Sequence, residues 1–494
     1  MVNEYKNYID GNWVEAKNGK TFQNINPANK DDIIGTFPDS NKDDVNYAVQ
    51  AAASAFEKWR LLPAPKRGEI IFKACGLLKE NKQEIAALMT REMGKIAKET
   101  NGDVQEGIDT AEYIAGEGRR LFGETTPSEL REKFCMSIRA PIGVCGIITP
   151  WNFPLAIPSW KIFPALLCGN TIVFKPAHDT PASAVKFVES LEEAGAPKGV
   201  VNLVNGMGRD VGEPLVKHSD VNLISFTGSS STGKEIASLC GANLKRVSLE
   251  LGGKNAQIVM DDADIDLAVE GALWGAFGTT GQRCTATSRL ILHKKISDKF
   301  MDKFITRSKA LKIGNGLDPL TDMGPLINDS QRERVHKYVQ IGQEEGSELI
   351  SGGSYYEEGA AAKGFFYKPT IFRKVRPDMR IAQEEIFGPV VAIIEIASFE
   401  EAIKVLNNTS YGLSASIYTN DINKAFKAIR DIQAGVTYIN GPTIGAEVHL
   451  PFGGVKNTGN GHREAGKAVL DTFSEWKAVY IDYSGKLQKA QIDN

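Results

Sequence analysis

Val144-Cys145-Gly146-Ile147-Ile148 is the first of five short apolar segments that alternate with stretches of helical length. The other four lie near 171–175, 201–204, 222–226 and 246–250. A further apolar run at 256–260 leads into a second alternating pattern through 290–455. Short apolar strands separated by helices predict parallel sheets covered on both faces. We therefore expect an α/β fold with doubly wound sheets, in which ligands bind at the carboxyl ends of the strands.

The chain before this pattern predicts scaffold. Asp10-Gly11-Asn12 indicates a hairpin among short strands at 8–38. From Asp43 to Trp59 the apolar residues recur with the helical period, and a second helical zone from Arg67 to about Leu121 is expected to break near Gly94 and Gly102. Residues 123–141 indicate a surface ribbon, and the tail from Thr472 to Tyr483 predicts an exposed strand whose unpaired edge would invite aggregation.

Composition limits the classes of partner. The 494 residues are enough for roughly three domains at about 150 residues each. A net charge of −3, from 58 basic and 61 acidic residues, leaves no basic stripe, so nucleic acid is not expected. The six cysteines lack disulfide or metal-ligand spacing, so no metal site is expected and a reducing, cytoplasmic location is favoured. No signal peptide or bilayer-length apolar run is present, so no membrane association is expected.

Polar residues gather where the predicted strands end. Asn152 follows the first strand, Lys175 closes the second, and Glu250 closes the fifth. Cys284 lies in a Gly/Thr-flanked loop just beyond a helix predicted over 264–277. A thiol and a carboxylate near each other supply a nucleophile and a candidate general base. Taken singly, each residue is more often structural: a buried cysteine, a turn asparagine or a solvated glutamate.

A phosphate loop is a competing interpretation of one segment. Gly228-Ser229-Ser230-Ser231-Thr232-Gly233-Lys234 fits most of the pattern G-x-x-x-x-G-K-[ST] of nucleotide triphosphatases. The next residue is Glu235, where a hydroxyl should hold magnesium, and its carboxylate would repel phosphates. The alternative is a helix N-terminus whose backbone N–H groups bind a pyrophosphate.

Six motifs, in order and spacing, resemble the aldehyde dehydrogenase superfamily over nearly the whole chain. They are Thr149-Pro150-Trp151-Asn152-Phe153-Pro154, Phe226-Thr227-Gly228-Ser229, Glu250-Leu251-Gly252-Gly253-Lys254-Asn255, Gly281-Gln282-Arg283-Cys284-Thr285-Ala286, Glu385-Ile386-Phe387-Gly388-Pro389 and Pro451-Phe452-Gly453-Gly454. The resemblance implies a Rossmann-like NAD(P)-binding domain (1–122 and 142–252), an α/β catalytic domain (253–455) and a β oligomerisation hairpin, with oligomerisation segments at 123–141 and 470–494. A homodimer or homotetramer is the implied assembly.

The resemblance also implies a mechanism. Cys284 would attack an aldehyde, the side-chain amide of Asn152 would stabilise the oxyanion of the thiohemiacetal, and hydride would leave for NAD(P), giving a thioester. Glu250 would then activate the hydrolytic water, and Lys175 is counted with these catalytic residues. Relatives that pass the thioester to coenzyme A generally lack this base, so a free carboxylic acid is the expected product.

The cofactor is expected to contact residues from several of these motifs. They are Ile148, Thr149, Pro150, Trp151, Lys175, Ala177, His178, Gly208, Gly212, Phe226, Thr227, Gly228, Ser229, Thr232, Leu251, Gly252, Glu385 and Phe387. NAD-specific relatives often carry glutamate where His178 stands, and that carboxylate repels a 2′-phosphate. Lys175, and His178 if protonated, would instead favour the phosphate. We expect NADP to be accepted and preferred over NAD.

The segment Asn440-Gly441-Pro442-Thr443-Ile444-Gly445-Ala446-Glu447 resembles the branch that oxidises 2-oxoglutarate semialdehyde (2,5-dioxovalerate). An anionic semialdehyde needs a cation in its pocket, for which Arg283 and His449 are the candidates. Other semialdehydes, glyceraldehyde-type substrates, betaine aldehyde and aliphatic aldehydes stay open. So do two other classes of protein: a nucleotide triphosphatase and a catalytically silent structural relative.

Overall fold

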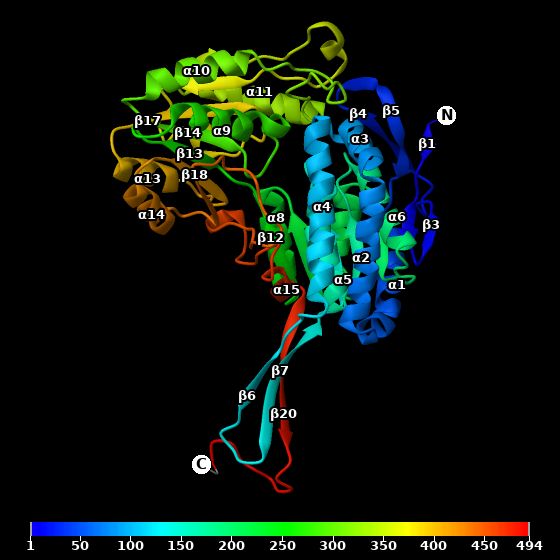
Figure 1. Ribbon diagram of the computed structural model, residues 1–494. Helices are drawn as coiled ribbons and strands as arrows, with labels where there is room; N and C mark the ends of the chain where they lie inside the picture. Colours follow the sequence, from blue (N-terminus) through cyan, green and yellow to red (C-terminus); the bar gives the residue numbers. More distant parts are fainter. Residues whose placement is uncertain (1, 493–494) are drawn as a thin grey trace.

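The computed structural model describes residues 2–492, which form an α/β fold with two seven-stranded sheets and a projecting three-stranded arm (Figure 1). The first sheet has the strand order β12-β11-β8-β9-β10-β2-β3. Its strands are β12 (Arg246–Glu250), β11 (Leu223–Thr227), β8 (Val144–Ile148), β9 (Thr171–Lys175), β10 (Val201–Leu203), β2 (Asn7–Ile9) and β3 (Asn12–Val14). The first five run parallel, and the hairpin β2-β3 adds antiparallel strands at one edge. The carboxyl ends of β8, β9, β11 and β12 therefore meet at one edge of the sheet.

Helices cover both faces of this sheet. Alternate strand residues enter different cores: Ile147 and Phe174 pack with α5 and α6, whereas Ile148 and Val173 pack with α1, α7 and α8. The bounds are α1 (Lys42–Leu61), α2 (Ala64–Glu80), α3 (Lys82–Met93), α4 (Ala97–Glu117), α5 (Ala156–Cys168), α6 (Pro181–Glu193), α7 (Glu213–Lys217) and α8 (Ser230–Ala242). In Figure 1, α2 and α4 form a further layer outside α5. The sequence prediction of a buried, doubly covered sheet is confirmed.

The predicted helix break at Gly102 is wrong. Gly102 lies inside α4, on its exposed side. A glycine inside a helix is less favourable than alanine by about 1 kcal/mol, and the packing of α4 against α2, α3 and α5 outweighs this. The break at Gly94 is confirmed, because Gly94 ends α3 in a left-handed conformation with φ 91°. An additional break separates α2 from α3 at Asn81.

The second sheet has the order β15-β16-β17-β14-β13-β18-β19 and is parallel except for β15. Its strands are β13 (Asn255–Val259), β14 (Thr287–His293), β15 (Glu348–Ser351), β16 (Thr370–Arg373), β17 (Val390–Ile396), β18 (Ser414–Tyr418) and β19 (Val436–Ile439). Helices α9 (Ile265–Phe277) and α10 (Ser297–Lys309) pack on one face. The other face carries α11 (Asp329–Glu344), α12 (Arg380–Gln383), α13 (Phe399–Asn407) and α14 (Ile422–Asp431).

The chain passes from the first sheet to the second through Leu251-Gly252-Gly253-Lys254, which joins β12 to β13. Two glycines permit this passage. A Cβ on Gly252 would lie 2.3 Å from the Glu385 carboxylate, and a Cβ on Gly253 would lie 2.6 Å from the carbonyl oxygen of Cys284. Glycine at both positions therefore lets Glu385 and the Cys284 loop approach the end of β12.

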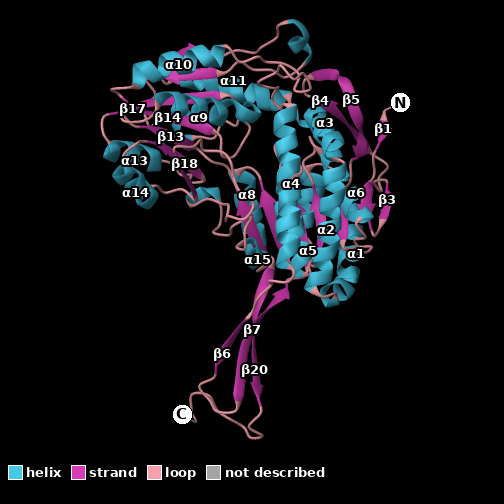
Figure 2. Cartoon of the chain, viewed as in Figure 1, coloured by secondary structure: helices cyan, strands magenta, loops and turns pink. Residues whose placement is uncertain are grey.

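The arm consists of β6 (Glu124–Pro127), β7 (Lys133–Pro141) and β20 (Ser474–Asp482), and Figure 2 shows it extending away from both sheets. The exposed strand predicted for the tail is confirmed as β20, which lies at the edge of this sheet. β20 pairs with β7 of the same chain along its whole length, from Ser474 opposite Pro141 to Asp482 opposite Lys133. The second edge of β20 has no partner strand among the described residues.

The remaining elements are short. A three-stranded sheet of β1 (Asn3–Glu4), β5 (Asn29–Pro38) and β4 (Thr21–Asn26) lies beside the first sheet, and α15 (Val469–Thr472) packs on α5. Within residues 2–492, the helices are all too short or too polar to cross a bilayer.

Candidate active site

The loop that carries Cys284 is held in a strained conformation. After α9, a 3₁₀ turn covers Gly278–Gly281, and Thr279 and Thr280 have φ values of 51° and 56°. Such values are unfavourable for β-branched residues and persist only when the surroundings impose them. The buried Glu99 carboxylate accepts a hydrogen bond of 2.6 Å from the N–H of Thr279, and the Thr280 hydroxyl donates to the Gly324 carbonyl. These contacts fix the turn that presents Cys284.

Cys284 lines two cavities. Its carbonyl oxygen accepts a hydrogen bond of 2.7 Å from Nδ2 of Asn255. Burial, followed by the negative charges of Glu385 and Glu250, raises the pKa of the Cys284 thiol to about 12. The resting side chain is therefore a thiol, and its attack on a carbonyl requires transfer of its proton to another group.

Asn152, in the loop after β8, lines the first of these cavities together with Cys284. This cavity has a volume of about 180 Å³, and Asn152, Cys284, Gly252, Glu385 and Phe387 are among its lining residues. The buried side chain of Asn152 donates from Nδ2 to the carbonyl oxygen of Gln282 at 3.0 Å. A side-chain amide beside a nucleophile can donate a hydrogen bond to an oxyanion formed there.

A buried ion pair holds the Asn152 loop through a hydrogen bond to its backbone. Nζ of Lys95 donates to the Asn152 carbonyl at 2.9 Å and to Asp103 at 2.6 Å. The other oxygen of Asp103 accepts from the N–H of Ala156 at 2.7 Å. The side chains of Lys95 and Asp103 are fully buried. Neither residue was singled out from the sequence, where Met93-Gly94-Lys95 is indistinguishable from a helix end.

Glu250 faces Cys284 across the second cavity, of about 130 Å³. The residue closes β12 and is buried, and neither carboxyl oxygen has a hydrogen-bond partner among the described residues. Burial and the charge of Glu464 raise the pKa of Glu250 well above its ordinary value, while Lys161 and Arg463 act in the opposite direction. A confined carboxyl of this kind can take up a proton near neutral pH.

Residues expected to contact a dinucleotide line a wide cavity of about 910 Å³ and the narrow cavity with Asn152. The wide cavity is lined by Ile148, Thr149, Pro150, Trp151, Lys175, Ala177, His178, Gly208, Gly212, Phe226, Thr227, Gly228 and Thr232. The narrow one adds Ser229, Leu251, Gly252, Glu385 and Phe387. Because Pro150, Trp151, Thr227 and Gly228 line both, the two cavities adjoin. Lys175, which was also expected to be catalytic, lines the wide cavity and neither of the two beside Cys284.

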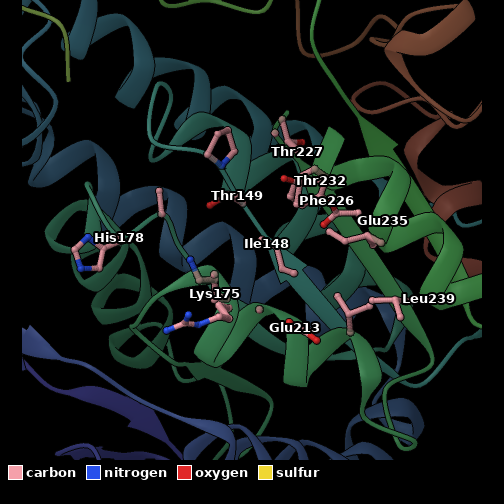
Figure 3. A pocket seen from close by; sticks show the side chains of 18 of the residues that line it. Ile148, Thr149, Lys175, His178, Glu213, Phe226, Thr227, Thr232, Glu235 and Leu239 are labelled. Atoms are coloured by element: carbon pink, nitrogen blue, oxygen red, sulfur yellow. The ribbon is translucent and has the colours of Figure 1, made fainter. Parts of the chain in front are cut away.

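The wide cavity fits a dinucleotide. It lies at the carboxyl ends of β8, β9 and β11, and Ser229 caps the N-terminus of α8 at its edge, where backbone N–H groups favour a phosphate. Figure 3 shows Lys175 and His178 on one side of the cavity and Thr232, Phe226 and Glu235 on the other. Lys234, which a phosphate loop would direct at a nucleotide, is exposed on α8 and does not line this cavity.

One ring stack, one edge-on ring contact and one backbone hydrogen bond shape the two adjoining cavities. The ring of His178 stacks on that of Phe22 with centroids 3.8 Å apart, and burial lowers the pKa of His178 below its usual value. Burial therefore disfavours the cationic form of His178 that the sequence analysis considered. At the other end, one carboxyl oxygen of Glu385 accepts a hydrogen bond of 3.1 Å from Gly253 N–H, and Phe387 packs edge-on against Trp151.

Of the two candidate cations for an anionic substrate, only Arg283 lines the cavity of Cys284 and Glu250. His449 lies outside that lining, 3.4 Å from the carboxylate of Glu447, with both side chains exposed. The expectation for His449 is therefore wrong as a cavity residue in this structure. The same cavity contains Glu106 and Glu464, which the sequence analysis missed because neither lies in a recognisable motif.

Comparison with known proteins identifies the family. The pattern of the aldehyde dehydrogenase family matches residues 13–479. The alpha-ketoglutaric semialdehyde dehydrogenase of Bacillus subtilis is 43% identical over 479 residues, covering 97% of this chain and 98% of that protein. The betaine aldehyde dehydrogenase of the same organism is 42% identical over 477 residues, covering 96% of each. The crystal structure of Staphylococcus aureus betaine aldehyde dehydrogenase in complex with NAD+ superposes with a TM-score of 0.96 at 37% identity, covering 98% of this chain and 96% of that one.

The chain belongs to the aldehyde dehydrogenase family and is an NAD(P)-dependent aldehyde dehydrogenase. Family membership over almost the whole length confirms the resemblance found in the six motifs and decides against a nucleotide triphosphatase.

Proposed function

We propose that the chain oxidises 2-oxoglutarate semialdehyde to the free dicarboxylic acid, with Cys284 as nucleophile. The observation that carries this proposal is the cavity in which Cys284, Glu250 and Arg283 lie together. Arg283 is the only cationic side chain among the residues that line it. A guanidinium N–H in the pocket of a semialdehyde can donate a charge-assisted hydrogen bond and so favours a substrate whose other end is a carboxylate. The names of two relatives, the one from Bacillus subtilis and a 2,5-dioxopentanoate dehydrogenase of Saccharolobus solfataricus, point to the same substrate.

The chain's own residues would act in a fixed order. Cys284 releases its proton to solvent and its sulfur attacks the aldehyde carbon, and the amide of Asn152 donates a hydrogen bond to the oxyanion that forms. When bound, NAD(P) would supply the hydride acceptor, and Glu385 would help to hold it in the cavity that Asn152 lines. Glu250 lines the other cavity of Cys284. Glu250 then takes a proton from that water as it attacks the thioester, and the free acid leaves.

A steady-state comparison tests the substrate. Reduced-cofactor formation is measured with 2,5-dioxovalerate, pentanal and betaine aldehyde, each against the Cys284→Ala variant as blank. We expect kcat/KM for 2,5-dioxovalerate to exceed that for pentanal at least about tenfold, since a charge-assisted contact contributes about 1.5–3 kcal/mol. Faster oxidation of betaine aldehyde than of the dicarbonyl acid would contradict the proposal and favour the other class of relative.

We further propose that NADP is preferred over NAD. Residue 178 is a histidine, so the adenine ribose would meet no carboxylate at this position that repels a 2′-phosphate. Lys175 and the exposed Arg209 line the same cavity and offer two cationic groups to the phosphate. Burial lowers the pKa of Lys175 to about 8, so this residue still carries a proton at neutral pH. The ratio of kcat/KM for the two cofactors at pH 7 is the test, and a ratio below one contradicts the proposal.

Assembly and location complete the proposed function. The arm offers the free edge of β20 and exposed apolar side chains such as Trp476 and Tyr480, which favour a homodimer or homotetramer. Light scattering tests this, and a monomer would contradict it. All six cysteines are free thiols, which is typical of a reducing compartment and supports a cytoplasmic location.

A further inference from the structure

Three ion pairs lie near the loops of Asn152 and Cys284. Lys95 pairs with Asp103, and Lys161 pairs with Glu464 through a short contact that is also buried. Arg283 pairs with Glu99 at 3.2 Å. Each of these three cations is therefore already balanced by a carboxylate.

These pairs leave two carboxyl groups of the cavity unpaired, Glu250 and Glu106. Glu106 lies on α4, one turn beyond Asp103. Together with Arg283 it lines the cavity of about 130 Å³ that Cys284 shares with Glu250. The carboxyl group of Glu106 makes no hydrogen bond or ion pair with any described residue. An unpaired carboxyl in a confined, partly apolar cavity is more stable in its neutral form.

The charges around Glu106 come from several elements. On its own helix are Asp103 and Asp109, which disfavour its ionisation, and from outside the helix Lys95 and Arg283 favour it. Burial is the largest influence, and the pKa of Glu106 is raised to about 8. Tyr438, on β19, lies close enough for its own pKa to be affected by Glu106, and it stays neutral because that pKa is raised to about 12.

Arg283 offers the cavity only part of its guanidinium group. Nε donates to the hydroxyl of Thr279 at 2.9 Å and Nη2 donates to Glu99. The rings of Phe153 and Trp274 lie over the guanidinium, 5.2 and 5.0 Å from its carbon. Nη1 is the nitrogen without a partner among the described residues, so Arg283 can donate one fixed hydrogen bond but brings little unbalanced charge.

We propose that Glu106 and Arg283 together form the subsite for the charged end of the substrate, with Glu106 acting as a neutral acid that donates a hydrogen bond. This inference rests on the proposed function, since it assigns the group that recognises the 2-oxo acid end of the semialdehyde. Arg283 supplies Nη1 to the substrate carboxylate, and the protonated carboxyl of Glu106 supplies a second donor to the carboxylate or the neighbouring ketone. Ionisation of Glu106 removes that donor and places a negative charge beside an anionic substrate.

The consequence is a pH-dependent preference for substrate charge. The measured quantity is the ratio of kcat/KM for 2,5-dioxovalerate to that for pentanal, because effects on the thiol and on the cofactor are shared and cancel. We expect this ratio to be constant below pH 7.5 and to fall about tenfold between pH 8 and pH 9.5. In Glu106→Gln the amide donates at every pH, so the ratio should be flat and, at pH 7, within about threefold of the wild type.

A matched control is Glu112→Gln, which changes an exposed carboxylate on the same helix, paired with Lys79 and outside the cavity lining, and should retain the fall. Binding of 2-oxoglutarate to the Cys284→Ala variant, followed by calorimetry from pH 7 to 9.5, gives a readout without turnover. Affinity should weaken above pH 8 unless Glu106→Gln is also present.

The outcomes separate two failures. A ratio near one at every pH would overturn the proposed substrate itself. A high ratio that falls equally in the wild type and in Glu106→Gln would leave the substrate standing and overturn the role of Glu106. Loss of betaine aldehyde oxidation in Glu106→Gln, without an effect on the anionic substrate, would also overturn it, because Glu106 would then act as a carboxylate that attracts cations.

Discussion

The wide cofactor cavity and the smaller cavity that Cys284 shares with Glu250 differ in volume and in the parts of the chain that line them. The first measures about 910 Å³ and is built largely from strand ends and backbone between residues 148 and 239. The second measures about 130 Å³ and draws side chains from positions as far apart as Glu106 and Glu464. A dinucleotide needs length and backbone donors, which consecutive strand–helix units provide. Aldehyde chemistry needs a few groups with controlled protonation, which only packing from distant segments provides.

The largest effect is expected when the nucleophile Cys284 is removed. Cys284→Ala should lower kcat by at least about 10⁴-fold, because no other group in the smaller cavity can form the covalent intermediate. NADP binding, measured by fluorescence titration, should change less than about threefold. Cys135→Ala, in the arm, is the control and should leave turnover intact. Residual activity above about 1% would assign the nucleophile to another residue.

Removing the base should separate the two halves of the reaction. In Glu250→Gln we expect acylation to continue and hydrolysis to slow by about 10²–10³-fold, so a burst of reduced cofactor precedes slow turnover. The raised pKa of Glu250 means that its ionised, active form increases as pH rises, so wild-type hydrolysis should accelerate with pH and the variant should not.

Stopped-flow absorbance from pH 6 to 9 measures both phases. Glu270→Gln, which changes an exposed carboxylate paired with Arg307, serves as the control. If the variant lost its burst as well, the role assigned to Glu250 in hydrolysis would have to be abandoned.

Breaking the buried Lys95–Asp103 pair, which holds the Asn152 loop, should lower both the rate of catalysis and the stability of the protein. Asp103→Asn leaves Lys95 as an uncompensated buried charge, which typically destabilises a protein by about 3–5 kcal/mol. We expect a lower Tm and a loss of about 10- to 100-fold in kcat, with a smaller change in the KM for NADP, because the loop holds the oxyanion donor more than the cofactor.

Glu112→Gln breaks an exposed pair with Lys79 and is the matched control, since such pairs contribute about 0–1 kcal/mol. A Tm loss without any change in kcat would show that Lys95 and Asp103 support the fold alone.

The smallest effect concerns the wide cavity. His178→Glu introduces a carboxylate at its edge and should move the NADP/NAD ratio of kcat/KM about tenfold toward NAD. Turnover at saturating cofactor should be unchanged, since residue 178 lines only the wide cavity. His178→Gln keeps the position neutral and should retain the wild-type ratio. An unchanged ratio in both variants would place the 2′-phosphate elsewhere.

Much of the wide cavity was predictable because its residues are close in sequence to the strands that carry them. Apolar runs with a helical spacer specify a parallel sheet, and residues just after such runs must gather at one edge. The error at Gly102 and the unforeseen pairing of the tail both arose where contacts between distant segments decide the structure. Gly102 stays helical because α4 is supported by α2, α3 and α5, and the tail pairs with β7, from which some 330 residues separate it along the chain.

By itself, the sequence determined the two parallel sheets, the order of the motifs and the loop that holds Cys284, since these follow from local periodicity and neighbouring residues. Only the tertiary structure decided which charges are paired. Asp103 with Lys95, Glu99 with Arg283 and Glu464 with Lys161 meet through packing between segments. Protonation depends on burial and on such neighbours, so the neutral state inferred for Glu106 and the raised pKa of Glu250 could not be read from the chain.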